Sequence, residues 1–124
     1  MYDALILSEK TRNELLAIFP PVYTDEIGHH VTIKFGVGKN YVQPNVKMAD
    51  VVAYVDDTKG CEAFIVQVDG ETYRPDGKPY HITWSIDRAA GVKPMHAGDV
   101  AKDESIWVKI DPPIQIEFTH EIVE

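Results

Sequence analysis

The chain has 124 residues with a formal net charge of −8, and 44% of its residues are apolar. This is enough for one hydrophobic core in a single domain over residues 1–124. The acidic balance argues against broad binding to duplex DNA, which needs many Lys and Arg on one face, and no apolar run approaches the roughly 20 residues of a membrane span.

Alternating or aliphatic segments predict strands over residues 2–7, 29–36, 47–57, 61–68, 80–86, 106–110 and 114–123. After the first strand, Ser8 is a good N-cap for a helix that carries Leu15, Leu16 and Phe19 at helical spacing and ends before Pro20. We expect residues 88–96 to be irregular and residues 97–105 to hold a short helical turn. The pattern indicates an α+β fold with a mostly antiparallel sheet and few helices.

The single cysteine, Cys61, excludes an internal disulfide and fits a reducing compartment. The first ten residues have neither a basic region nor a small-residue cleavage site, so they do not read as a secretory signal. We therefore expect a cytoplasmic protein.

Two of the predicted strands carry a histidine and a threonine two residues apart, in "GHHVTIKFG" at 28–36 and in "YHITWSID" at 80–87. Side chains alternate between the two faces of a strand. The polar faces are expected to hold His30, Thr32 and Lys34 in the first strand and His81, Thr83 and Ser85 in the second. The apolar faces are expected to hold Val31, Ile33 and Phe35 in the first strand and Ile82, Trp84 and Ile86 in the second.

If the two polar faces meet, two imidazoles and two hydroxyls converge on one groove. Phosphodiester cleavage can use such a set: one histidine takes a proton from the attacking oxygen, and the other protonates the leaving oxygen. Threonine hydroxyls can donate to the non-bridging oxygens, where charge develops in the transition state. This chemistry needs no metal and no cofactor.

The two segments resemble the paired His-x-Thr motifs of the 2H phosphoesterase superfamily. The stretch "RAAGVKPMHAGDV" at 88–100 is similar to the segment after the second motif in the tRNA-ligase-type cyclic phosphodiesterases, and small phage-encoded proteins of this superfamily are known. The resemblance implies a bilobal fold, with two pseudo-symmetric antiparallel sheet halves around a central groove. It also implies that His30 and His81 are the catalytic pair and that Thr32 and Thr83 bind phosphate.

Three further residues are candidates for substrate binding. Lys93 follows the second motif and could hold a phosphate oxygen, with a solvated surface lysine as the alternative. Tyr2 and Trp84 could stack on a base, although Trp84 shares the apolar face of its strand and core packing is the other reading. The resemblance and these residues together predict a metal-independent phosphodiesterase that acts on a 2′,3′-cyclic phosphate RNA end or on a small cyclic or 2′,5′-linked nucleotide.

Three alternatives stay open from the sequence. The groove could bind a nucleotide or RNA end without cleaving it, or the substrate could be a cyclic dinucleotide or oligonucleotide defence signal. A structural protein in which both motifs are packing coincidences is a third reading. The sequence does not determine the oligomeric state or which histidine is the acid.

Overall fold

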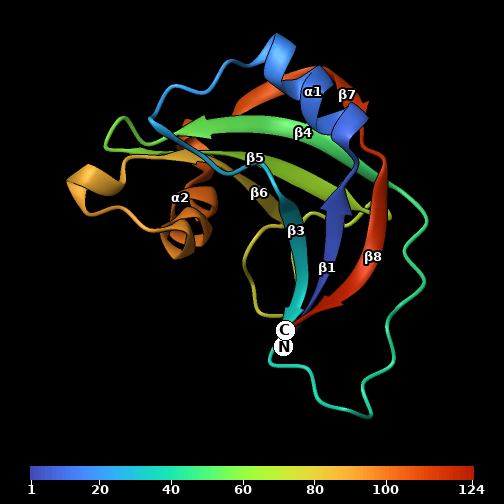
Figure 1. Cartoon of the computed structure of the whole chain (residues 1–124). Coiled ribbons are helices and arrows are strands. Elements are labelled where there is room, and N and C mark those ends of the chain that lie inside the picture. The colour runs from blue at the N-terminus through green and yellow to red at the C-terminus, as the bar shows by residue number, and fades with distance from the viewer.

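A computed structural model describes residues 1–124 and shows one strongly curled antiparallel sheet, in effect a half-barrel (Figure 1). Its strand order is β7-β4-β5-β6-β3-β1-β8, and the short β2 pairs with β6. The strands are β1 (Tyr2–Leu7), β2 (Asp25–Glu26), β3 (His30–Phe35), β4 (Ala49–Asp56), β5 (Cys61–Val68), β6 (His81–Ile86), β7 (Val108–Gln115) and β8 (Phe118–Val123). The α+β class and the antiparallel sheet expected from the sequence are confirmed.

Two α-helices, α1 (Glu9–Ile18) and α2 (Ala97–Lys102), lie on opposite sides of the sheet (Figure 1). Three short 3-10 turns, η1 (Arg88–Ala90), η2 (Pro94–His96) and η3 (Glu104–Ile106), flank α2. Ser8 caps α1 as expected, because its hydroxyl accepts a hydrogen bond from the Thr11 amide at 3.1 Å. None of the helices is long and apolar enough to cross a membrane.

Each face of the sheet buries its own set of apolar side chains. The α1 face packs Leu15 against Val31, Phe64, Ile82 and Trp84, among others. The α2 face packs Ala97 and Ala101 against residues of β4, β5 and β6, namely Ala53, Val55, Cys61, Ala63, Ile65 and Ile86. Because both faces of β5 are covered, that strand is buried almost throughout, and it forms the centre of the fold.

In each strand that carries a His-x-Thr motif, a register shift changes the face to which the residues after the threonine point. Tyr2 pairs with Phe35 and Ala4 with Thr32, so one extra residue is accommodated in β3 opposite β1. A similar shift between β5 and β6 lies at Trp84. An extra residue inverts the alternation beyond it. The expected faces are therefore corrected: Phe35, and not Lys34, continues the His30 face, and Ile86 packs on the α2 side rather than with Trp84.

β2 and β3 approach β6 in two different registers. Glu26 pairs with Ser85, whereas Val31 pairs with Ile82, so two additional residues are taken up between β2 and β3. Gly28 lies in this segment with φ +51°, and a Cβ there would lie 2.8 Å from the ring of Trp84. Only glycine combines this backbone conformation with such a close approach.

The C-terminal strands differ from the expected ones. β7 continues through Pro112 and Pro113 to Gln115, whereas the sequence predicts a break there between residues 106–110 and 114–123. Proline lacks an amide donor but is tolerated in β7, because β7 is an edge strand and bonds only to β4. β8 then pairs with β1, with Tyr2 opposite Val123, and the two chain ends lie side by side (Figure 1).

Candidate active site

The four residues of the two His-x-Thr motifs line one cavity of about 480 Å³, which we call the histidine cavity. Its lining comprises Tyr2, Ile27, His30, Thr32, Phe35, Arg74, Lys78, His81, Thr83, Pro94, Met95 and Gly98. A volume of this size is within the range of nucleotide-sized ligand sites. The convergence of the two motifs, expected from the sequence as a geometric possibility, is thus present in the fold.

The pairing of β3 with β6 explains why the motifs meet. Val31 lies opposite Ile82, and both side chains enter the core on the α1 side. The residues that flank this pair in each strand therefore point to the other side, where the cavity lies. Thr32 and His81, which flank this pair, both line the cavity.

Three other segments close the histidine cavity. The loop between β5 and β6 contributes Arg74 and Lys78, and η2 with the start of α2 contributes Pro94, Met95 and Gly98. Tyr2 and Phe35, from the paired ends of β1 and β3, stand 5.9 Å apart between ring centroids. The walls are therefore partly aromatic and partly cationic.

His81 is fixed by its own strand. Its Nδ1 lies 2.8 Å from the carbonyl oxygen of Pro79. A carbonyl oxygen can only accept, so Nδ1 carries the hydrogen and donates it. In the neutral ring Nε2 is then the basic nitrogen, and it is the atom through which His81 can exchange a proton with a ligand.

His30 has a second imidazole beside it. The Nδ1 atoms of His29 and His30 are 3.0 Å apart, and one of the two must donate to the other. Strict alternation along a strand would put His29 on the face opposite to His30. His29 precedes β3, however, and lies in the segment that takes up two additional residues, so simple alternation does not hold there. The ring of Tyr2 lies 5.3 Å from that of His30, so His30 is held between two rings.

Both cavity histidines resist protonation. Burial lowers the pKa of His30 from 6.5 to about 4, with contributions from the imidazoles of His29 and His81. Burial also lowers the pKa of His81, and the cations Arg74 and Lys78 act in the same direction, while the hydrogen bond to Pro79 opposes them. At pH 7 both rings are therefore mainly neutral, and a bound anion would favour the charged forms.

Of the three residues expected to bind substrate, Tyr2 lines the histidine cavity, Trp84 lies in the core and Lys93 lies in a neighbouring pocket. Trp84 has no exposed surface, and its Nε1 donates to the Phe19 carbonyl at 2.9 Å on the α1 side. The expectation that Trp84 stacks on a base is therefore corrected: its strand face turns it into the core.

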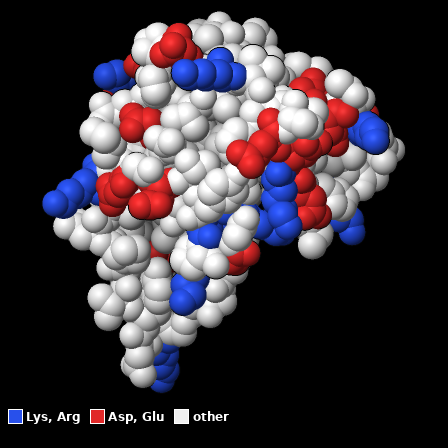
Figure 2. All heavy atoms as spheres, turned by 180° about the vertical axis from the view of Figure 1, so that it is seen from behind, with Lys and Arg blue, Asp and Glu red and all other residues white.

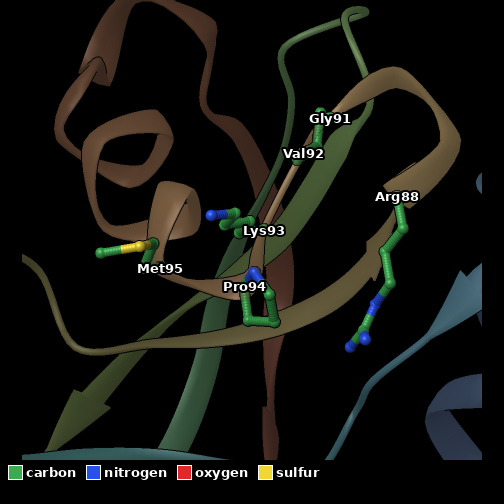
Figure 3. Close-up of a pocket in the computed structure, with 6 residues that line it drawn as sticks. All are labelled: Arg88, Gly91, Val92, Lys93, Pro94 and Met95. Carbon is green, nitrogen blue, oxygen red and sulfur yellow. The ribbon is translucent and has the colours of Figure 1, made fainter.

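Lys93 does not line the histidine cavity. It belongs to a neighbouring pocket of about 530 Å³, lined by Arg88, Gly91, Val92, Lys93, Pro94 and Met95 (Figure 3). The two basic side chains of this pocket extend in different directions and do not converge (Figure 3). The pockets share only Pro94 and Met95, so the expected phosphate contact of Lys93 is not made in the cavity that holds the histidines.

Arg74 and Lys78 are not among the residues that the sequence pattern singles out for substrate binding. They flank the "PDG" turn of the β5–β6 connection, which reads as an ordinary loop. The available signal was their position: two cations placed four residues apart, directly before the second motif. No group of three or more His, Cys, Asp or Glu side chains is arranged to hold a metal ion.

Comparisons with protein-family models, with curated proteins and with solved structures give no match for this chain. The geometry and chemistry of the histidine cavity are therefore the basis for assigning a function.

Proposed function

We propose that the protein is a metal-independent phosphodiesterase that hydrolyses a 2′,3′-cyclic phosphate RNA end or a small cyclic or 2′,5′-linked nucleotide. The observation that carries the proposal is the presence of His30, Thr32, His81 and Thr83 on the wall of one cavity. Two proton-transfer groups and two hydroxyl donors at one point are the groups that in-line displacement at phosphorus requires. The likeness of both motifs to those of the 2H phosphoesterases supports the same reading.

The proposed reaction assigns one proton transfer to each histidine. His30 takes a proton from water as the water oxygen forms a bond to phosphorus. The bond between phosphorus and the leaving ribose oxygen breaks, and that oxygen takes a proton from His81. Hydrolysis of a cyclic phosphate then leaves a phosphomonoester, with the hydroxyls of Thr32 and Thr83 donating to the non-bridging oxygens.

The environment of each ring supports this assignment. The hydrogen bond from His81 to the Pro79 carbonyl opposes the lowering of the pKa of this ring by burial, which favours His81 as the acid. His30 has a pKa of about 4 and is therefore neutral at pH 7, so it is present in the form that can accept a proton. The negative charge of the substrate phosphate would supply the stabilisation that a protonated His81 needs.

The proposal includes a two-halved architecture. β1, β3 and β8 form one half and β4, β5, β6 and β7 the other, each holding one motif. β2 and β3 join the halves by pairing with β6, at Asp25–Ile86 and Glu26–Ser85 and again at Val31–Ile82.

The outer surface supports a small substrate over a long RNA. The chain carries a formal net charge of −8, and clusters of acidic side chains occupy the face in Figure 2, with separate Lys and Arg side chains between them. Such a surface repels an extended polyanion. The cations of the histidine cavity can still hold one phosphate group.

A sequestering module is the second candidate, and the low pKa values of both histidines favour it. If a bound ligand did not raise the pKa of His81 enough, the leaving oxygen would receive no proton and the ligand would stay intact. Cyclic dinucleotide or oligonucleotide defence signals are a further ligand class for the same cavity.

The test is a hydrolysis screen with EDTA present throughout. The substrates are 2′,3′-cyclic nucleotides, 2′,5′-oligoadenylates and cyclic dinucleotides. We expect turnover by the native chain and a loss of about 10²–10⁴-fold in His30→Ala and in His81→Ala. His96→Ala is the matched control, because His96 is exposed and outside the histidine cavity. Undiminished turnover in both single variants would refute the mechanism, and intact ligand recovered from the native chain would favour sequestration.

A further inference from the structure

The β5–β6 loop buries a permanent positive charge beside the histidines. Arg74 is only 5% exposed and lines the histidine cavity. Arginine is rarely buried to this extent without a full set of partners. The two proton transfers proposed above do not involve Arg74, although it lies close enough to affect the pKa of His81.

Two contacts fix the orientation of the guanidinium. Asp76 accepts hydrogen bonds from Nε at 3.1 Å and from Nη2 at 2.8 Å, which is a bidentate pairing. The Phe35 ring centroid lies 5.4 Å from the guanidinium carbon. The Asp76 side chain is half exposed, whereas the Arg74 side chain that it holds is buried.

The third guanidinium nitrogen has no partner. Nη1 of Arg74 is buried and makes no hydrogen bond within the protein. An unsatisfied donor on a charged group is among the costlier features a folded protein can carry. Such a cost is expected where a donor is kept free for a ligand.

We propose that Arg74 is the anion anchor of the histidine cavity and binds a phosphate oxygen of the ligand. The ligand class rests on the proposed function, but the site rests on the free donor, the bidentate hold of Asp76 and the stacking on Phe35. A planar guanidinium with two nitrogens already engaged presents the remaining one in a fixed direction. Arg74 thereby positions the phosphate against the threonine hydroxyls and beside His81.

Lys78 does not share this role. Its Nζ lies 3.7 Å from the carboxylate of the exposed Asp99 in α2, and Lys78 has no buried donor without a partner. A Cβ at Gly98 would lie within 3.3 Å of the Lys78 side chain, which explains why α2 can approach this lysine so closely. Lys78 therefore bridges the loop to α2, while Arg74 lines the histidine cavity with one donor unused.

Phosphate binding to the full chain tests the proposal independently of turnover. Inorganic phosphate is titrated at constant ionic strength, and the ring resonances of His30 and His81 are followed by NMR. We expect phosphate to shift both resonances in the native chain and to raise the pKa of His81. Arg74→Met should bind phosphate about 10- to 100-fold more weakly, since it loses a charge-assisted hydrogen bond.

Two further variants guard against a folding artefact. Asp76→Asn keeps the cation and removes the carboxylate that offsets its charge, so we expect phosphate to bind at least as tightly as in the native chain. Arg88→Met removes an exposed arginine outside the histidine cavity and should bind phosphate like the native chain. Native-like phosphate affinity in Arg74→Met would overturn the proposal.

The outcome separates this inference from the proposed function. Phosphate binding that depends on Arg74, in a chain that hydrolyses none of the substrates, would retain the anion anchor and remove the catalytic role. Hydrolysis at the native rate and KM in Arg74→Met would retain the catalytic role and remove the anion anchor.

Discussion

The burial of His30 makes the stability of the whole fold depend on pH. In the folded chain its pKa is about 4, against 6.5 for an unperturbed histidine. The unfolded chain therefore binds a proton at His30 more readily than the folded chain does. The stabilisation is complete above pH 6.5, is lost as the pH falls towards 4, and changes no further below that value.

The magnitude follows from the two pKa values. Protonation of the unfolded chain alone lowers the free energy of unfolding by about 2 kcal/mol at pH 5 and about 3 kcal/mol at pH 4, relative to neutral pH. These are upper bounds, because His30 is only half-buried and solvent screens part of the effect. Carboxylates and His81 add pH dependence of their own, so the effect has to be isolated by substitution.

The assay is urea unfolding of the native chain and of His30→Asn at pH 7.5 and pH 5. Asparagine stays neutral at both pH values, so the variant lacks the His30 contribution. We expect the native chain to lose up to about 2 kcal/mol more than the variant between these pH values. Equal losses in the native chain and His30→Asn would show that His30 is solvated, and the reasoning about its desolvated cavity would fail.

Three further predictions follow from the same structure. Thr32→Val and Thr83→Val should each lower kcat by about 10²-fold with little effect on KM, measured on the best substrate, because each removes a donor that acts mainly in the transition state. Tyr2→Ala should raise the KM for nucleotides by about 10-fold or more if a base stacks on its ring, whereas Tyr2→Phe should match the native chain. Gly28→Ala should lower the free energy of unfolding by about 1–3 kcal/mol in urea titrations, because the new Cβ meets Trp84 in a strained backbone conformation.

The parts of the site that follow from strand alternation could be predicted from the sequence. Val31 and Ile82 enter the core, and the motif residues beside them face the cavity, as a period of two requires. The same rule fails beyond Thr32, because the inserted residue sends Phe35 to the cavity side. No local signal marks such an insertion, since it is set by pairing with β1, whose partner residues are distant in sequence.

The cationic wall could not be predicted for a different reason. In the sequence Arg74 is an ordinary loop residue. Its burial depends on how the β5–β6 loop packs against Phe35. That packing is tertiary and leaves no periodic trace. Trp84 shows the converse: alternation alone assigns it to the core, and its candidacy for stacking rested only on its residue type.

In the proposed mechanism, the electrostatics of the cavity couple phosphate binding to the protonation of His81. Without a ligand, burial disfavours protonated His81, and the charges of Arg74 and Lys78 act in the same direction, while the hydrogen bond to Pro79 and the charge of Asp76 oppose them. The free site therefore holds the Arg74 cation, paired with Asp76, and two mainly neutral imidazoles. A phosphate bound at Arg74 would offset that cation and bring a negative charge next to His81. The same event would then occupy the unused donor of Arg74 and raise the pKa of the acid. On this account a protonated His81 is most populated when a phosphate is in place, which explains how a desolvated histidine can serve as an acid near neutral pH.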